Sequence, residues 1–97
     1  MIRHIVFFTA REAKDREAIH AGLSILKDVP HGRNKEIGRN RNVDAISDRV
    51  DFVVYGEFED EAELAAYKAH PLYQRSIELV RPLRELRIAA DFESEVG

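Results

Sequence analysis

The chain has no cysteine among its 97 residues. A disulfide framework, a thiolate nucleophile and a thiolate metal site are therefore all excluded. Long apolar runs are also missing, because the opening MIRHIVFFTAR is apolar for only a few residues before charge returns. That stretch is too short for the apolar part of a signal peptide or for a membrane span, so we expect a soluble cytoplasmic protein without membrane contact.

Charge of one sign is not concentrated anywhere in the chain. The net charge is −3, and the 15 lysines and arginines are scattered through the sequence. The one denser basic stretch, HGRNKEIGRNRN, is diluted by glycine and asparagine and indicates a solvated strand and loop. Because nucleic-acid binding requires a basic stripe that neutralises phosphates, we predict no nucleic-acid partner.

Several motifs of catalysis and cofactor binding are absent as well. Gly32 and Gly38 do not stand between a strand and a helix, so no phosphate-binding loop is predicted. No serine has the surroundings of a nucleophile elbow. The candidate metal ligands form neither an i, i+4 pair nor a short cluster, so we predict no metal site and no cofactor. These candidates are His4, Asp51, His70 and Asp91.

Apolar periodicity divides the chain into four strands and two helical regions. With 44% hydrophobic and 34% charged residues, the composition suits one globular domain spanning 1–97. Runs of β-branched and aromatic residues predict strands at 2–9, about 34–40, 49–59 and 85–93. Apolar residues at three- and four-residue steps predict helices within 12–29 and from Asp60 to about Leu83, and the polar segment 41–48 indicates a loop.

The order β-α-β-β-α-β predicts an α+β protein of the ferredoxin-like type, with a four-stranded antiparallel sheet and two helices on one face. In the last strand we expect the alternate apolar residues to point inward, namely Leu86, Ile88, Ala90 and Phe92. Both faces of 2–9 and 49–59 carry apolar side chains, although helices can cover only one face. An exposed apolar face of that size marks an interface. We therefore predict a homodimer that packs sheet against sheet through the open face and forms a dimeric α+β barrel.

The second helical region contains a predicted break. Asp60 and Glu63 form a D-x-x-E start, in which the Asp60 carboxylate caps the helix and Glu63 can reach back. His70 precedes a proline and is biased away from the α conformation, so the helix should end or kink there. A new helical piece can begin at that proline. His70 lies three residues from both Tyr67 and Tyr73, and the three side chains can share one face if the kink is mild.

Three segments of the chain resemble the stress-responsive A/B-barrel (Dabb) family: HIVFF, VDFVVYGEFEDEAELAAYKAHP and DFE. The run F-x-[DS]-x-x-x-[LI]-x-x-Y-x-x-H-P within the second segment is the most specific part. The resemblance implies small chains that assemble as dimeric α+β barrels, many bacterial members having no assigned activity. Plant members include stress-induced proteins and a polyketide cyclase that closes a linear poly-β-keto chain by an intramolecular aldol step.

For the cyclase, the resemblance implies a motif with a tyrosine, a His-Pro step and a second histidine that acts as base. By position, Tyr67 matches the tyrosine, His70 matches the His-Pro histidine, and His4 matches a histidine of the first strand. Tyr73 stands where the second histidine would be. At pH 7 an imidazole of pKa about 6.5 is roughly three-quarters neutral, whereas a phenol of pKa about 10 is only about 0.1% ionised. A positioned base contributes about 10²–10⁴-fold, so the exchange would remove most of that contribution, although Tyr73 can still donate a hydrogen bond to a carbonyl or enolate.

We therefore predict a pocket between sheet and helices that binds a small, partly aromatic or keto-bearing molecule, with His4, Tyr67, His70 and Tyr73 as its polar groups. Each residue has a plainer alternative: His70 as a cap at the proline break, His4 as a hydrogen-bonded core residue, and the two tyrosines as packing. The sequence leaves the catalytic residues unassigned. A non-enzymatic stress or structural dimer, a cyclase-like enzyme and a cofactor-free monooxygenase all remain alternatives.

Overall fold

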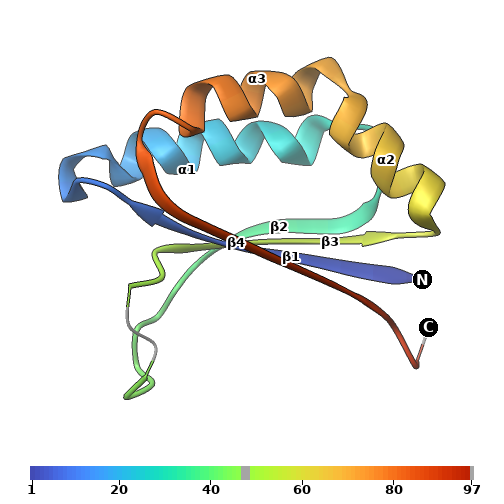
Figure 1. Ribbon diagram of the computed structural model, residues 1–97, viewed down its shortest axis with the longest axis horizontal. Helices are drawn as coiled ribbons and strands as arrows, with labels where there is room; N and C mark the ends of the chain where they lie inside the picture. Colours follow the sequence, from blue (N-terminus) through green and yellow to red (C-terminus); the bar gives the residue numbers. More distant parts are fainter. Residues whose placement is uncertain (47–48, 97) are drawn as a thin grey trace.

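The computed structural model describes residues 1–46 and 49–96, and Figure 1 shows its arrangement. Its strands are β1 (Ile2–Ala10), β2 (Arg33–Arg39), β3 (Phe52–Phe58) and β4 (Arg84–Glu93). Its α-helices are α1 (Arg16–Ser24), α2 (Glu61–Ala69) and α3 (Pro71–Val80), and 3-10 turns at Ala13–Asp15 and Ile25–Asp28 flank α1. Residues 41–46 lie outside any helix or strand, as the sequence predicts, while positions 47 and 48 of the expected loop lie outside the described residues.

The strands form one antiparallel sheet in the order β2-β3-β1-β4. All three α-helices lie on one side of this sheet, and α1 and α3 run side by side above it (Figure 1). No helix formed by residues 1–46 and 49–96 lies on the other side of the sheet. This arrangement confirms the predicted ferredoxin-like α+β fold, with the second helical region divided into α2 and α3.

The division between α2 and α3 falls at the predicted residue. His70 has extended backbone angles, φ −67° and ψ 141°, and α3 begins at the proline that follows. At the start of α2, the Asp60 carboxylate accepts a hydrogen bond from the Glu63 amide at 2.9 Å. The Glu63 side chain reaches back to the Glu59 amide at 2.6 Å, one residue before the cap. Local sequence chemistry therefore fixes both ends of α2.

The core lies between the sheet and the helices. Alternate residues of β1 and β3 are buried against the helices, whereas the residues between them face the open side. The largest fully buried side chains include Phe52 and Phe58 of β3, Ile19 and Leu23 of α1, and Tyr67 of α2. Burying side chains of this size stabilises the fold by about 1.5–3 kcal/mol each. The core therefore holds the helices in place over one side of the sheet, and the candidate site lies on that side.

Helices α1 and α3 approach closely because α1 carries a glycine at the crossing. A Cβ placed on Gly22 would lie only 2.8 Å from Val80 Cγ2 of α3. The buried Ser76 hydroxyl of α3 donates a hydrogen bond to the Gly22 carbonyl at 2.8 Å. A larger residue at position 22 would therefore force the Val80 side chain or one of the two helices to shift.

The side of β4 that was expected to face the helices instead faces the open side of the sheet. It pairs with β1 so that Ala90 lies opposite Ile5 and Ile88 opposite Phe7. Because directly opposed residues of an antiparallel pair share a face, the alternate set at 86, 88, 90 and 92 lies on the open side, and the prediction that it points inward was wrong. Alternation identifies an apolar face but does not say which layer covers it. The helix-facing positions of β4 are instead 87, 89 and 91.

The open side of the sheet is apolar with one polar cluster. Phe7, Ile88 and Phe92 are 37%, 51% and 50% exposed on it. Beside Phe92, an Arg3 guanidinium nitrogen donates to the Tyr55 hydroxyl at 2.6 Å and to a Glu57 carboxylate oxygen at 3.2 Å. The Tyr55 hydroxyl in turn donates to Glu57 at 2.6 Å. An apolar face with an internally paired polar cluster is suited to covering by another protein surface.

Candidate functional site

A cavity of about 190 Å³ lies between the helix-facing side of the sheet and helices α1 and α3. Its apolar walls come from every layer of the core: Val6, Phe8, Leu23, Leu26, Val54, Ile77 and Val80. Its polar lining consists of one histidine, two tyrosines, a serine and three arginines: His4, Tyr67, Tyr73, Ser76, Arg81, Arg84 and Arg87. Half of the lining residues are apolar and half carry a polar group, so the cavity suits a small molecule with both an apolar body and polar substituents.

His4 lies in β1 between Gly56 of β3 and Asp91 of β4. Its side chain is buried, and Nδ1 is hydrogen-bonded to the Asp91 carboxylate. An ionised carboxylate can only accept, so Nδ1 carries the ring proton and Nε2 keeps its lone pair. Since the carboxylate occupies Nδ1, Nε2 is the ring nitrogen left for a molecule in the cavity that His4 lines.

The protonation state of His4 follows from its burial. Burial lowers the pKa of His4 below its ordinary value of about 6.5, and the hydrogen bond and charge of Asp91 oppose this shift only in part. Lys68 and Arg87 lower the pKa a little further. His4 is therefore mostly neutral at pH 7, which is the form that can accept a proton.

Tyr67 lies in α2 and is 1% exposed. Its ring packs 4.8 Å from the Phe58 ring and 5.0 Å from the Tyr73 ring, and the Lys35 ammonium lies 5.7 Å from its centre. Burial raises the pKa of Tyr67 well above its ordinary value. Its hydroxyl therefore stays protonated and serves as a hydrogen-bond donor rather than as a base.

Tyr73 of α3 is half-buried and stands beside an arginine of β4. Its hydroxyl accepts a hydrogen bond from an Arg87 guanidinium nitrogen at 3.5 Å. Ser76, one turn further along the helix, lines the cavity but has its hydroxyl engaged with the Gly22 carbonyl. Of these two polar residues of α3, Tyr73 is therefore the one whose hydroxyl contacts an arginine of the lining.

His70 lies apart from the other three expected pocket residues, because it does not line the cavity. Its Nδ1 accepts a hydrogen bond from the Leu72 amide at 3.1 Å, which caps α3. Its ring stacks edge-on against His31, with 6.2 Å between ring centres. The structure thus brings His4, Tyr67 and Tyr73 together and uses His70 at the helix junction.

Five polar residues of the site were not assigned to it from the sequence, namely Ser76, Arg81, Arg84, Arg87 and Asp91. Asp91 was considered only as a metal ligand, because its pairing with His4 joins residues 87 positions apart. The three arginines follow one another at steps of three in RPLRELR, a spacing that could have drawn attention. That segment was interpreted as the end of a helix and the start of a strand, so its positive charge was not connected with a pocket.

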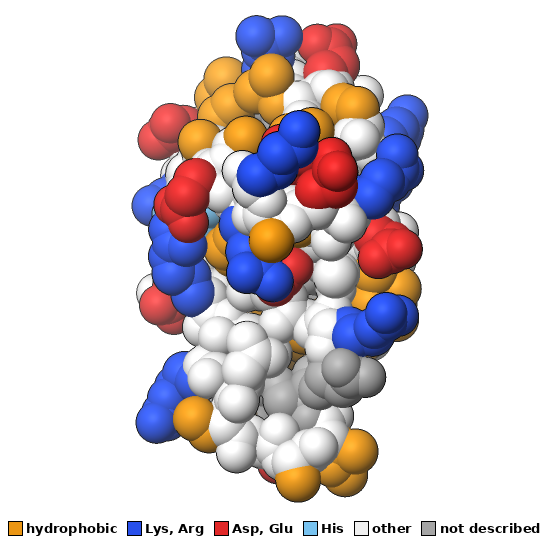
Figure 2. Space-filling model, turned by 90° about the vertical axis from the view of Figure 1, so that its left-hand side faces the viewer, with side chains coloured by type: hydrophobic (Ala, Val, Ile, Leu, Met, Phe, Trp, Pro, Cys, Tyr) orange, Lys and Arg blue, Asp and Glu red, His pale blue; other side chains and the backbone are white. Residues whose placement is uncertain are grey.

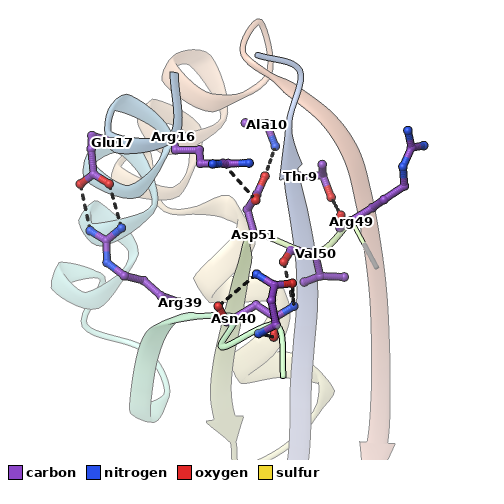
Figure 3. A network of polar contacts seen from close by, with 10 residues as sticks. Thr9, Ala10, Arg16, Glu17, Arg39, Asn40, Arg49, Val50 and Asp51 are labelled. Carbon is purple, nitrogen blue, oxygen red and sulfur yellow. Dashed lines mark hydrogen bonds and ion pairs between the residues drawn. The ribbon is translucent and has the colours of Figure 1, made fainter. Parts of the chain in front are cut away.

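A separate polar network closes the end of the sheet nearest the start of α1 (Figure 3). The Asp51 carboxylate accepts from the Ala10 amide at 2.8 Å and pairs with Arg16 at 3.2 Å, and Glu17 pairs with Arg39 at 2.8 Å. The Glu17 carboxylate has its pKa lowered mainly by the hydrogen bond from Arg39. These groups satisfy one another and tie α1 to the sheet, so the network is structural.

Three further features of the described residues concern metal binding, surface charge and membrane contact. Within residues 1–46 and 49–96, no three His, Asp or Glu side chains come together to hold a metal ion. Over the upper and middle parts of the view in Figure 2, lysines and arginines are interspersed with acidic residues. No helix in the described part of the chain is long and apolar enough to cross a membrane.

The comparisons with known proteins agree with this architecture. The family model described as the stress responsive A/B barrel domain matches residues 2–94, and the chain therefore belongs to the Dabb family. A comparison with curated proteins found no significant match.

Solved structures with the same fold include both uncharacterised proteins and enzymes. A dimeric ferredoxin-like protein of unknown function from Jannaschia sp. CCS1 is 23% identical, with 96% of this chain and 98% of that chain covered and a TM-score of 0.84. A similar protein from Thermobifida fusca YX is 26% identical, with 94% and 88% covered and a TM-score of 0.78. SnoaB, a cofactor-independent oxygenase from Streptomyces nogalater, is 17% identical, with 97% and 92% covered and a TM-score of 0.70.

Proposed function

We propose that this Dabb protein binds a small, partly apolar molecule in the sheet–helix cavity and removes a proton from it with His4. The observation that carries the proposal is the His4–Asp91 hydrogen bond at the wall of that cavity. A carboxylate on Nδ1 orients the imidazole and stabilises the cation that forms when Nε2 takes a proton. A histidine that was only a core residue would not need to line a cavity.

The cavity suits a ligand about the size of a substituted aromatic ring. An apolar cavity of roughly 150 Å³ holds benzene, and the present cavity measures about 190 Å³. Such a ligand could carry a C–H next to a carbonyl, or a phenolic O–H. Nε2 of His4 would take the proton, and the bonding electron pair would pass to the ligand oxygen as an enolate or phenolate. The Tyr67 and Tyr73 hydroxyls are the nearby donors for that oxygen.

Deuterium exchange tests the base directly. The probe is 1-tetralone, a bicyclic aromatic ketone, incubated with the protein in deuterated buffer while NMR follows loss of the protons next to the carbonyl. We expect the protein to accelerate exchange and His4→Gln to abolish the acceleration, because glutamine cannot take the proton. The control His31→Gln changes a histidine outside the cavity lining and should exchange like the parent. Equal exchange by the parent and His4→Gln would overturn the role of His4.

Two other functions could use this site, and the parent protein and the His4→Gln variant also distinguish between them. Deprotonating a phenol is also the first step of its oxidation by O₂ without a cofactor, and SnoaB shares the fold. Oxygen uptake with a naphthalenediol, lost in His4→Gln, would favour that activity over simple proton transfer. Binding of the probe without exchange or oxygen uptake would favour a non-enzymatic binding protein.

We also propose that the chain works as a homodimer joined through the open face of the sheet. The exposed apolar side chains of β1 and β4 on that face support this assembly, as do the dimeric ferredoxin-like proteins of the same fold. In that arrangement the cavity stays inside each subunit, under its own helices, and remains accessible from the helix layer.

A further inference from the structure

Three arginines of one short segment line the cavity, and the proposed proton transfer does not account for them. Arg81 follows the last residue of α3, Arg84 is the first residue of β4, and Arg87 lies further along β4. Nothing in the packing of a core requires three guanidinium groups at one cavity. Three cations at one cavity favour a ligand of opposite charge.

A strand irregularity brings two of these arginines to the same face. Residues 84 and 87 are an odd number of positions apart, so a regular strand would send them to opposite faces. The pairing of β4 with β1 shifts register between Thr9 and Ala10, and Arg84 lies opposite Ala10 while Arg87 lies opposite Phe8. Ala10 and Phe8 both face the helices. A bulge of this kind re-aims a side chain, and here it turns Arg84 toward the cavity.

The three arginines differ in their pairing from five of the other arginines, although Arg11 and Arg41 likewise have no carboxylate within ion-pair distance among the described residues. Elsewhere Arg3, Arg16, Arg33, Arg39 and Arg75 each pair with a carboxylate. Among the described residues, no carboxylate lies within ion-pair distance of Arg81, Arg84 or Arg87, and the Tyr73 hydroxyl is the side-chain partner of Arg87. Burial, together with the charges of Arg87 and Arg81, lowers the pKa of Arg84. The cluster is therefore a positive region without an internal counter-charge, in which Arg84 is half-buried while Arg81 and Arg87 are exposed.

We propose that the ligand of this cavity is a carboxylic acid with an apolar, ring-sized body, whose carboxylate is held by Arg84 and Arg87 with Arg81 close by. This inference rests on the proposed function, because it names the class of molecule that the same cavity takes. A guanidinium group presents two parallel N–H donors that match the two oxygens of a carboxylate. The apolar body would lie among the core side chains near His4, with the charge toward the start of β4.

A matched pair of probes tests the charge separately from the cavity. They are 2-naphthoate and its neutral amide, 2-naphthamide, which have the same ring system and nearly the same size. Binding is measured by isothermal titration calorimetry at low and moderate salt. We expect the acid to bind at least about tenfold more tightly than the amide, since hydrogen bonds to charged groups are worth more than neutral ones. The difference should shrink as salt rises.

The variants Arg84→Gln and Arg87→Gln should each reduce the preference for the acid while leaving the affinity for the amide nearly unchanged. Arg75→Gln is the matched control, because Arg75 is a solvent-exposed arginine of α3 that pairs with Glu78 and does not line the cavity. It should keep the full preference. Retention of amide binding in the variants shows that they are folded, so a variant that merely unfolds cannot be taken for support.

The outcomes separate the two proposals. Equal binding of acid and amide by the parent protein, or an unchanged preference in both arginine variants, would overturn the carboxylate inference and leave the proposed cavity function standing. Failure of both probes to bind would overturn the inference and also count against the cavity as a site for ring-sized molecules. Tighter binding of the acid, lost in Arg84→Gln and kept in Arg75→Gln, would support it.

Discussion

His4 of β1 and Asp91 of β4 stand directly opposite each other in the sheet, and the carboxylate holds Nδ1 of the imidazole. Cross-strand pairing thereby places the proposed base against the carboxylate that orients it. The helix layer above them leaves a cavity next to the imidazole. The proposed function rests on these two residues and on the cavity beside them.

Replacing the carboxylate should change the titration of His4 in a defined direction. The hydrogen bond and the charge of Asp91 both raise the pKa of His4, against the lowering by burial. Asp91→Asn removes the charge, so we expect the pKa of His4 to fall below its value in the parent protein. NMR titration of the imidazole signals measures this shift. The control Glu93→Gln changes a more distant acid of the same strand, and a rise in Asp91→Asn would contradict the assigned pairing.

The lowered pKa of His4 predicts how stability depends on pH. Because the folded protein binds this proton less readily than the unfolded chain does, stability contributed by neutral His4 is present above the unfolded pKa of about 6.5. It is lost as the pH falls from there toward the folded pKa. Urea unfolding of the parent and of His4→Gln between pH 8 and pH 5 isolates this contribution. We expect the parent to lose more stability than the variant over that range, and parallel curves would contradict the assignment.

How far the sequence could predict this molecule depends on how local each feature is. The capping by Asp60 and the break at His70 are set by neighbouring residues, and both were predicted correctly. The facing of β4 and the partner of His4 depend on pairing between opposite ends of the chain. Arg84 reaches the cavity only through the register shift beside Ala10. Periodicity of two in the sequence predicts a strand, but it cannot show a bulge in the pairing or which face the helices cover.

His70 provides a test of the distinction between cap and pocket residue. Because its Nδ1 accepts the Leu72 amide, His70→Ala should destabilise the protein by about 0.5–2 kcal/mol through loss of the α3 cap. His70→Asn retains a side-chain acceptor and should recover most of that loss. Chemical denaturation measures both changes. The folded variants should bind 2-naphthoate with the affinity of the parent protein. A specific loss of binding would instead show that His70 contributes to the ligand site.

If the open face of the sheet is the dimer interface, one charged residue introduced there should prevent dimerisation. Ile88 is 51% exposed there, on the same face as Phe7. In a sheet-to-sheet dimer, Ile88→Asp would bury an unpaired carboxylate, which strongly disfavours association. Light scattering coupled to size-exclusion chromatography should show a dimer for the parent and a monomer for this variant. The control Val43→Asp alters an exposed apolar residue outside the sheet and should stay dimeric. Circular dichroism establishes that the Ile88→Asp chain is folded, and a folded variant that remains dimeric would exclude this face as the interface.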